Sequence, residues 1–185
     1  MSEPSLPEKI VALHEALAAE RIGHAFGGAL ALAYYAEPRS TVDIDVNVFV
    51  PPARFDAVVG VLAPLGVTAD VAPAAVERDG QCRLWWGRTP VDVFFAYDEI
   101  HDAMRRSVRR VPFGTERIPV LGPEHLVVCK AAFDRPKDWL DIEQVVVTVD
   151  ALDVEEIRTR LTRIVGSTDA RARKLDRLLT RLLGD

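Results

Sequence analysis

The chain has 185 residues, of which 49% are hydrophobic and 28% are charged, and its formal net charge is −5. This composition suits one compact domain with a buried core, and the negative charge argues against a protein that coats nucleic acid. No run of about 18 apolar residues, no secretory signal pattern and no metal-type cysteine spacing is present, so a reducing cytoplasm is the expected compartment.

Helical and strand patterns alternate along the first two thirds of the chain. A Ser5-x-x-Glu8 capping box opens a helix that we expect to continue to about Ile22. Further helices are predicted over 29–36, 53–65 and 98–106. Strands are predicted over 42–48, 67–71, 82–86, 91–95, 110–113 and 117–120. From Pro123 onward the pattern is helical. The sequence therefore predicts an α+β fold, a mixed β-sheet flanked by helices, with a core over 1–122 and a helical part over 123–185 packed on it as a single compact unit.

The strand over 42–48 carries two acids one residue apart, Asp43 and Asp45. Side chains at i and i+2 of a strand point to the same face, so these carboxylates are expected side by side, with the apolar residues opposite. Adjacent like charges repel and need a counter-charge, which a hard divalent cation such as Mg²⁺ can supply. The alternative is an ordinary pair of surface acids on an edge strand.

A third acid, Asp92, interrupts the apolar run Val91–Phe95. If its strand lies beside the first, three carboxylates converge, and Asp92 could bind metal and help to deprotonate an attacking hydroxyl. The alternative is a salt bridge from Asp92 to Arg83 or Arg88.

A glycine pair, Gly27 and Gly28, precedes the predicted helix over 29–36. Glycines at a helix start let backbone amides approach a ligand closely, and the positive end of the helix dipole suits a phosphate. Because such pairs also form simple turns, the pair alone is weak evidence for phosphate binding.

Taken in order, Phe26-Gly27-Gly28, Asp43-x-Asp45 and Asp92 resemble the nucleotidyltransferase superfamily of DNA polymerase beta type. The stretch Arg39–Asp45 is similar to the bacterial branch that includes abortive-infection toxin nucleotidyltransferases. The resemblance implies a nucleotidyltransferase-like sheet and a transferase that moves a nucleoside monophosphate from a nucleoside triphosphate, such as ATP, to an acceptor hydroxyl. It also implies Asp43, Asp45 and Asp92 as catalytic residues and ligands of two Mg²⁺ ions, with Mn²⁺ as a substitute.

The resemblance continues into the helical part, where the residues that match are Lys130, Arg135, Lys137, Asp138 and Asp141. It implies that Lys130 faces the nucleotide phosphates. The nucleotide-binding residues expected from the resemblance are Gly27, Gly28, Thr41, Lys130, Asp138 and Asp141. Without it, Lys130 reads as a snorkelling surface lysine, and Asp138 and Asp141 as ordinary polar residues early in a helix.

Two departures from the family pattern are present. The 14 residues between Gly28 and Asp43 form a slightly long spacer, and Gly28 stands where a serine hydroxyl would help to bind phosphate. The acceptor stays open among an RNA end such as that of tRNA, a protein hydroxyl and a small molecule such as an aminoglycoside. A toxin would also have an antitoxin partner. The alternative function is a non-catalytic interaction protein on the same fold, which the intact set of three acids disfavours.

Overall fold

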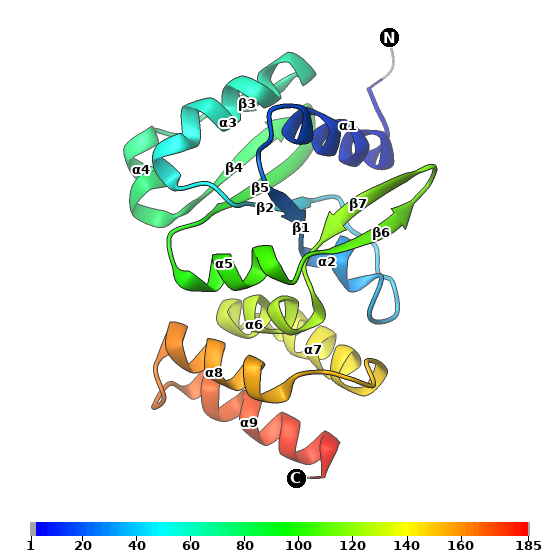
Figure 1. Cartoon of the computed structure of the whole chain (residues 1–185), viewed down its shortest axis with the longest axis vertical. Helices are drawn as coiled ribbons and strands as arrows, with labels where there is room; N and C mark the ends of the chain where they lie inside the picture. Colours follow the sequence, from blue (N-terminus) through cyan, green and yellow to red (C-terminus); the bar gives the residue numbers. More distant parts are fainter. Residues whose placement is uncertain (1–2, 185) are drawn as a thin grey trace. The chain divides into compact units, whose positions relative to one another are not determined.

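The computed structural model describes residues 3–184 (Figure 1). The chain divides into two compact units, which are described separately. The first comprises the chain up to Leu30 together with Ser40–Val120, and the second comprises Ala31–Arg39 and the chain from Leu121 onward. No helix within the described residues combines the length and the hydropathy that a membrane crossing requires.

The first unit is built on a mixed sheet, which in the described part of the chain has seven strands in the order β3-β4-β5-β2-β1-β7-β6. The strands are β1 (His24–Phe26), β2 (Ile44–Val48), β3 (Val67–Ala69), β4 (Gln81–Trp86), β5 (Thr89–Phe95), β6 (Arg109–Phe113) and β7 (Glu116–Val120). The central strand β2 runs parallel to β5 and antiparallel to β1. Ile44 and Val46 of β2 and Val91 and Val93 of β5 are almost fully buried, which confirms that both acidic strands contribute to the core.

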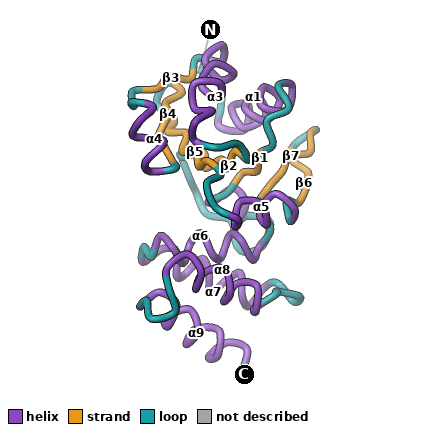
Figure 2. Tube along the Cα trace, turned by 60° about the vertical axis from the view of Figure 1, so that its left-hand side comes forward, coloured by secondary structure: helices purple, strands orange, loops and turns teal. Residues whose placement is uncertain are grey.

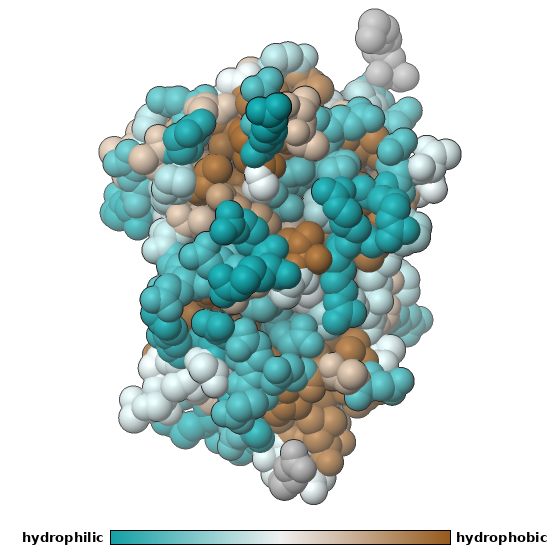
Figure 3. Space-filling model, viewed as in Figure 1, coloured by the Kyte–Doolittle hydropathy of each residue, from teal (hydrophilic) through white to brown (hydrophobic). Residues whose placement is uncertain are grey.

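The helices of the first unit are α1 (Leu6–Ala19), α3 (Phe55–Leu62), α4 (Pro73–Asp79) and α5 (Glu99–Arg106), with 3₁₀ turns at Pro52–Arg54 and Ala63–Leu65. Helix α3 packs against α1, α4 and β3, so these helices form one layer beside the sheet (Figure 2). Hydrophilic side chains cover the outward side of α5 (Figure 3). A short helix, α2 (Gly28–Leu32), begins in the first unit and ends in the second.

The second unit is helical and consists of α6 (Pro123–Phe133), α7 (Pro136–Thr148), α8 (Val154–Val165) and α9 (Ala170–Leu183). Helix α6 packs against the other three, which places it at the centre of this bundle. The segment Ala31–Arg39 joins it through Tyr35, whose hydroxyl donates a hydrogen bond to the backbone oxygen of Leu121 at 2.8 Å.

Most predicted elements are present, and the predicted α+β class with a helical C-terminal part is confirmed. The first helix was predicted to reach about Ile22, but α1 ends at Ala19. Two hydrogen bonds explain this end: Arg21 N–H donates to Ala18 O at 3.0 Å, and Ile22 N–H donates to Leu17 O at 2.8 Å. This is a Schellman motif, with Arg21 at φ 55° in the position that glycine usually occupies.

Two further elements have no counterpart among the predictions. Strand β1 is three residues long and buried at every position, so it has no alternating pattern to recognise. Helix α4 is seven residues long and buries only Val76. The predicted helix over 29–36 is also shorter than expected, because α2 covers only Gly28–Leu32 and gives way to turns.

Candidate functional site

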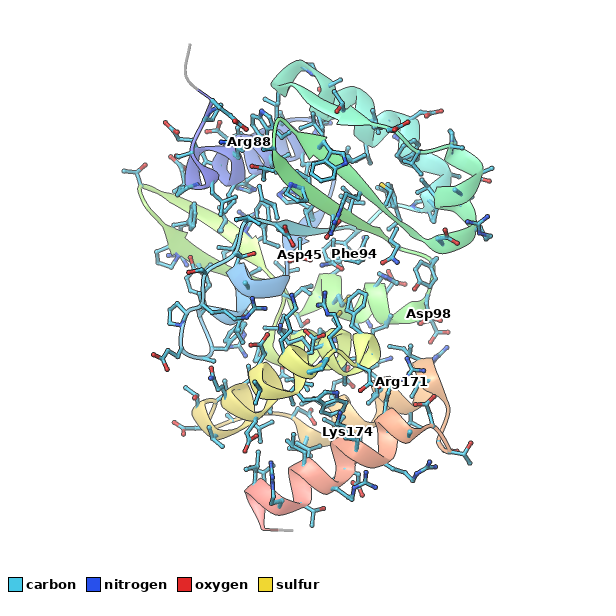
Figure 4. The ribbon with its side chains drawn as sticks, turned by 180° about the vertical axis from the view of Figure 1, so that it is seen from behind. Asp45, Arg88, Phe94, Asp98, Arg171 and Lys174 are labelled. Atoms are coloured by element: carbon cyan, nitrogen blue, oxygen red, sulfur yellow. The ribbon has the colours of Figure 1, made fainter. Side chains whose placement is uncertain are left out.

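The strand pairing brings two of the three predicted catalytic acids together. Strands β2 and β5 are parallel neighbours, and the register pairs Asp45 directly with Asp92. Adjacent strands lie about 4.8 Å apart and paired residues share a face, so both carboxylates project from the same side of the sheet. Figure 4 labels Asp45 of β2 and Phe94 of β5 on these two strands. The expectation that the strand of Asp92 lies beside the strand of Asp45 is confirmed.

The third acid, Asp43, was predicted on the strand over 42–48, but β2 begins only at Ile44, so Asp43 lies in the loop just before the strand and is partly exposed. Its backbone is held by Thr41, because Asp43 N–H donates to Thr41 Oγ1 at 3.2 Å and the hydroxyl in turn donates to Asp43 O at 3.3 Å. Thr41 therefore shapes the loop that carries Asp43.

Arg83 provides the positive charge beside the three acids. It lies opposite Asp92 in the antiparallel pair of β4 and β5, and donates from Nε to Oδ1 at 2.7 Å and from Nη2 to Oδ2 at 2.8 Å. These hydrogen bonds, with the charge of Asp92 and smaller contributions from Asp43 and Asp45, raise the pKa of Arg83. The salt bridge considered for Asp92 is thus present with Arg83. Arg88 instead donates its backbone N–H to Glu3 at 3.4 Å.

The glycine pair is joined to the acidic strand. Gly27 N–H donates to the backbone oxygen of Asp45 at 2.9 Å. Gly28 follows at φ 53°, and a Cβ at this position would overlap the carboxylate of Asp45. Only glycine lets the backbone turn into α2 at this distance from the acid, so the pair and Asp45 form one local structure.

The carboxylate oxygens of this region suit a hard cation, but the three acids are not positioned to bind one metal ion together. Asp43, Asp45 and Asp92 offer carboxylate oxygens, the ligand type that Mg²⁺ and Mn²⁺ prefer. Within residues 3–184, however, no group of three or more His, Cys, Asp or Glu side chains is placed to hold a metal ion. The guanidinium of Arg83 takes the place of a cation at Asp92, and the two Mg²⁺ ions stay a prediction.

The remaining predicted residues lie in the second unit, where they form a buried charge cluster. Lys130 Nζ donates to Asp141 at 2.6 Å and lies 3.7 Å from Asp138. Arg39 also binds Asp141, through Nε and Nη2 at 3.0 to 3.3 Å. Burial opposes ionisation of Asp141, but the hydrogen bonds from Arg39 and Lys130 hold its pKa below the ordinary value.

Burial overturns the simple surface interpretations of this cluster. Lys130 is 3% exposed, so it is not a snorkelling surface lysine. Asp138 is 0% exposed and accepts hydrogen bonds from the backbone N–H and the side chain of Arg135, the N-cap residue of α7. Asp138 and Asp141 are therefore structural partners of cations, and their contact with a nucleotide stays a prediction.

Two arginines of these clusters were given no functional role at the level of sequence. In the sequence, Arg39 belongs only to the matching stretch Arg39–Asp45, and Arg83 is only an alternative partner of Asp92. The Gly87-Arg88 turn held a usable signal, because in a two-residue hairpin the pairing Trp86–Thr89 fixes Arg83 opposite Asp92.

No family model matches the chain, and no curated protein matches it in sequence. Solved structures do resemble it. The antibiotic-resistance factor ANT(2'')-Ia aligns with a TM-score of 0.61 and 16% identity over 88% of this chain and 92% of that chain. A nucleotidyltransferase-like antigenic protein from Paracoccidioides brasiliensis aligns with a TM-score of 0.56 and 14% identity over 97% of each chain. The lincosamide antibiotic adenylyltransferase LnuA, bound to lincomycin, aligns with a TM-score of 0.55 and 11% identity over 78% of this chain and 98% of that chain.

At sequence identities of 11 to 16%, these comparisons show the fold alone. The chain has the fold of nucleotidyltransferases, which confirms the predicted architecture of a mixed sheet flanked by helices.

Proposed function

We propose that this chain is a metal-dependent nucleotidyltransferase, which moves a nucleoside monophosphate from a nucleoside triphosphate to an acceptor hydroxyl. The observation that carries the proposal is the alignment of Asp45 with Asp92 on neighbouring parallel strands, next to a glycine that clears the carboxylate. The nucleotidyltransferase fold of the solved neighbours supports it.

In this proposal each residue of the first unit has a distinct task. Asp43, Asp45 and Asp92 would hold the metal ions, and Asp92 would also accept or orient the proton of the acceptor hydroxyl. When bound, Mg²⁺ or Mn²⁺ would supply positive charge to offset the negative charge of the triphosphate. Gly27 and Gly28 bring backbone amides toward the phosphates. Arg83 must release Asp92 before that carboxylate can act as a ligand.

Thr41, Lys130, Asp138 and Asp141 are proposed nucleotide contacts on the strength of the sequence resemblance. For Lys130 the role requires an exchange of partners, because Asp141 now neutralises its ammonium group at 2.6 Å. A triphosphate oxygen offers the same charge-assisted hydrogen bond.

For the acceptor we propose a small hydroxyl-bearing molecule ahead of an RNA end or a protein. The support comes from neighbours whose names include adenylyl-2''-tobramycin and lincomycin. An antitoxin partner rests on the resemblance of Arg39–Asp45 to toxin nucleotidyltransferases.

One observation favours a second candidate, a non-catalytic interaction protein on the same fold. Arg83 occupies both oxygens of Asp92, and the described residues hold no ready metal cluster. Calorimetric titration with Mg²⁺ and nucleoside triphosphates discriminates the two, since an interaction protein should bind neither.

The direct test is a double substitution, Asp43→Asn with Asp45→Asn. The protein is incubated with each labelled nucleoside triphosphate, Mg²⁺ and a panel of acceptors: tobramycin, lincomycin, total RNA and cell lysate. We expect labelled product with the wild type and none with the double variant. The matched control is Asp56→Asn with Asp70→Asn, two exposed acids away from the strand pair, which should keep full activity. Equal labelling by the wild type and the double variant would disprove the proposed role of these acids.

A further inference from the structure

The first unit contains a polar pocket at the other end of the β1–β2 pair from Asp45. Residue His24 pairs with Val48, whereas Phe26, next to the glycines, pairs with Val46. A cavity of about 320 Å³ opens beside His24, within the range of small-molecule sites. Its polar lining consists of His14, Arg21, His24, Arg105 and Arg110.

The arginines of this pocket are available to bind an anion. Neither Arg21 nor Arg110 has a carboxylate within salt-bridge distance among the described residues, and both are exposed. Among the carboxylates of residues 3–184, Arg105 reaches only that of Asp102, at 3.7 Å and with both side chains exposed. Guanidinium groups present paired N–H donors that match the oxygens of a phosphate.

The backbone supports a role for Arg21. This residue lies at φ 55°, where a side chain is strained and glycine is the usual choice. The turn alone would favour glycine at this position, yet the residue is an arginine and it lines the pocket. A strained residue at a pocket suggests that its side chain has a role there.

The two histidines lie in a hydrogen-bonded chain that fixes their protons. His24 is 7% exposed, and its Nδ1 lies 2.8 Å from the backbone oxygen of Ile22, which can only accept. Nδ1 of His24 therefore carries the proton, and Nε2 of His24 accepts from Nδ1 of His14 at 2.8 Å. Nε2 of His14 is left without a hydrogen-bond partner among the described residues, and it becomes a donor only when His14 is protonated.

We propose that this pocket binds the phosphoryl group of a small phosphate ester, held by Arg21, Arg105 and Arg110. Apolar residues of the same lining, Ile22, Phe49 and Pro119, provide a surface for the organic part of the ester. Because the pocket and the acids lie at opposite ends of the strand pair, binding here does not depend on the metal ions of the proposed transferase site.

Protonation of His14 adds a fourth cationic donor, so the affinity for the ester rises at acidic pH. Burial and the charge of Arg110 lower the pKa of His14, while Glu15 and Glu116 oppose this change. Its neighbour His24 is held neutral, with a pKa lowered to about 4 mainly by burial. A bound phosphoryl group acts on His14 in the same direction as the two glutamates and favours the protonated form.

The test titrates the whole chain with glycerol 3-phosphate in metal-free buffer, followed by calorimetry and by imidazole ¹⁵N NMR. We expect saturable binding with shifts of the His14 ring signals, and a loss of affinity of about tenfold or more in Arg110→Gln. Arg106→Gln, an exposed neighbour of Arg105 outside the pocket, should bind like the wild type. The affinity should increase from about pH 7.5 to about pH 5.5, and His14→Gln should remove that increase.

Three outcomes of the titrations with the ester would overturn the proposal. The first is no binding at millimolar ester, and the second is an equal loss in Arg106→Gln, which would mark a diffuse charge effect. The third is loss of binding in Asp43→Asn with Asp45→Asn, which would assign the ester to the acidic site.

A titration with a single-stranded RNA oligonucleotide is a separate test of the same pocket. Tighter binding of the RNA than of the ester, lost in Arg110→Gln, would overturn the small-ester assignment in favour of an RNA phosphate. Failure of nucleotide transfer has no bearing on any of these readouts.

Discussion

Arg83 and Asp92 face each other across β4 and β5 and are joined by two hydrogen bonds, of 2.7 and 2.8 Å. The same guanidinium feels the charges of Asp43 and Asp45. A cation that binds these acids must therefore compete with Arg83, which makes this ion pair the contact that controls metal entry in the proposed function.

Substitution Arg83→Gln should strengthen metal binding. Loss of the guanidinium leaves Asp92 free and removes a positive charge beside the other two acids, so we expect Mg²⁺ or Mn²⁺ affinity to rise about tenfold. Calorimetry measures this without reference to activity. Arg88→Gln is the matched control, because Arg88 lies on the adjoining turn and does not bind Asp92. Unchanged or weaker metal binding in Arg83→Gln would contradict the competition.

Substitution Gly28→Ala should destabilise the first unit and abolish transfer. The new methyl group would collide with the carboxylate of Asp45, and the residue would keep a strained φ of 53°. We expect the free energy of unfolding in urea to fall by about 1–3 kcal/mol. Gly60→Ala provides the contrast, because nothing lies within 4 Å of a Cβ at this exposed helical position. That variant should gain about 0.5–1 kcal/mol. A Gly28→Ala protein as stable as the wild type would disprove the close approach.

Substitution Lys130→Met should destabilise the second unit by about 3–5 kcal/mol, because it removes the cation from between two buried acids. Asp138 and Asp141 are 0% and 4% exposed and cannot turn to solvent without unfolding part of the bundle. Chemical denaturation followed by tryptophan fluorescence measures this change. Of the three tryptophans, Trp139 is buried in α7 of this unit, whereas Trp85 and Trp86 lie on β4 of the first unit. Lys137→Met, at an exposed position of α7, should change stability little. Similar midpoints for the two variants would show that the cluster contributes no structural stability.

The stability of the first unit should fall as pH decreases from about 6.5 to about 4. The folded state holds the pKa of His24 near 4, mainly through burial, whereas the unfolded chain has the ordinary value of 6.5. In this window the unfolded state binds a proton that the folded state does not, so acid favours unfolding by up to about 3 kcal/mol. His24→Gln should flatten this dependence. Comparison of the two proteins at each pH removes the contribution of His101, whose pKa is also lowered. The pKa of His14 is lowered too, but His14 is hydrogen-bonded to His24, so the comparison measures the two histidines as a pair. Parallel stability curves for wild type and variant would refute the assignment.

Local patterns were enough to predict much of the proposed site. Alternation of apolar residues identified β2 and placed Asp45 on its polar face, because side chains of a strand alternate between two sides. The apolar run that Asp92 interrupts identified β5. The capping box of Ser5 and Glu8 located the start of α1 for a similar reason, since its hydrogen bonds lie within one turn. The predicted end of α1 was wrong, because the residue in the left-handed position that ends the helix is Arg21 and not the glycine that usually signals a helix terminus.

The partners of the charged residues required the folded chain. Lys130 lies 11 residues from Asp141, and Arg39 lies 102 residues from the same acid. No sequence pattern predicts these two contacts with Asp141, because they form only when the second unit packs. The pocket of His14, His24 and Arg110 was equally hidden, since the histidines carry no ligand spacing and β1 has no periodic signal.

Sequence alone established the acidic strands, the glycine pair and the resemblance to nucleotidyltransferases, since these depend on residue types at short spacing. Tertiary structure established that β2 and β5 are parallel neighbours in register, that Arg83 neutralises Asp92, and that Lys130 is buried. The physical reason is the distance along the chain over which each interaction acts. Side-chain alternation and capping act within a few residues, whereas charge compensation and burial depend on distances that only the packed chain sets.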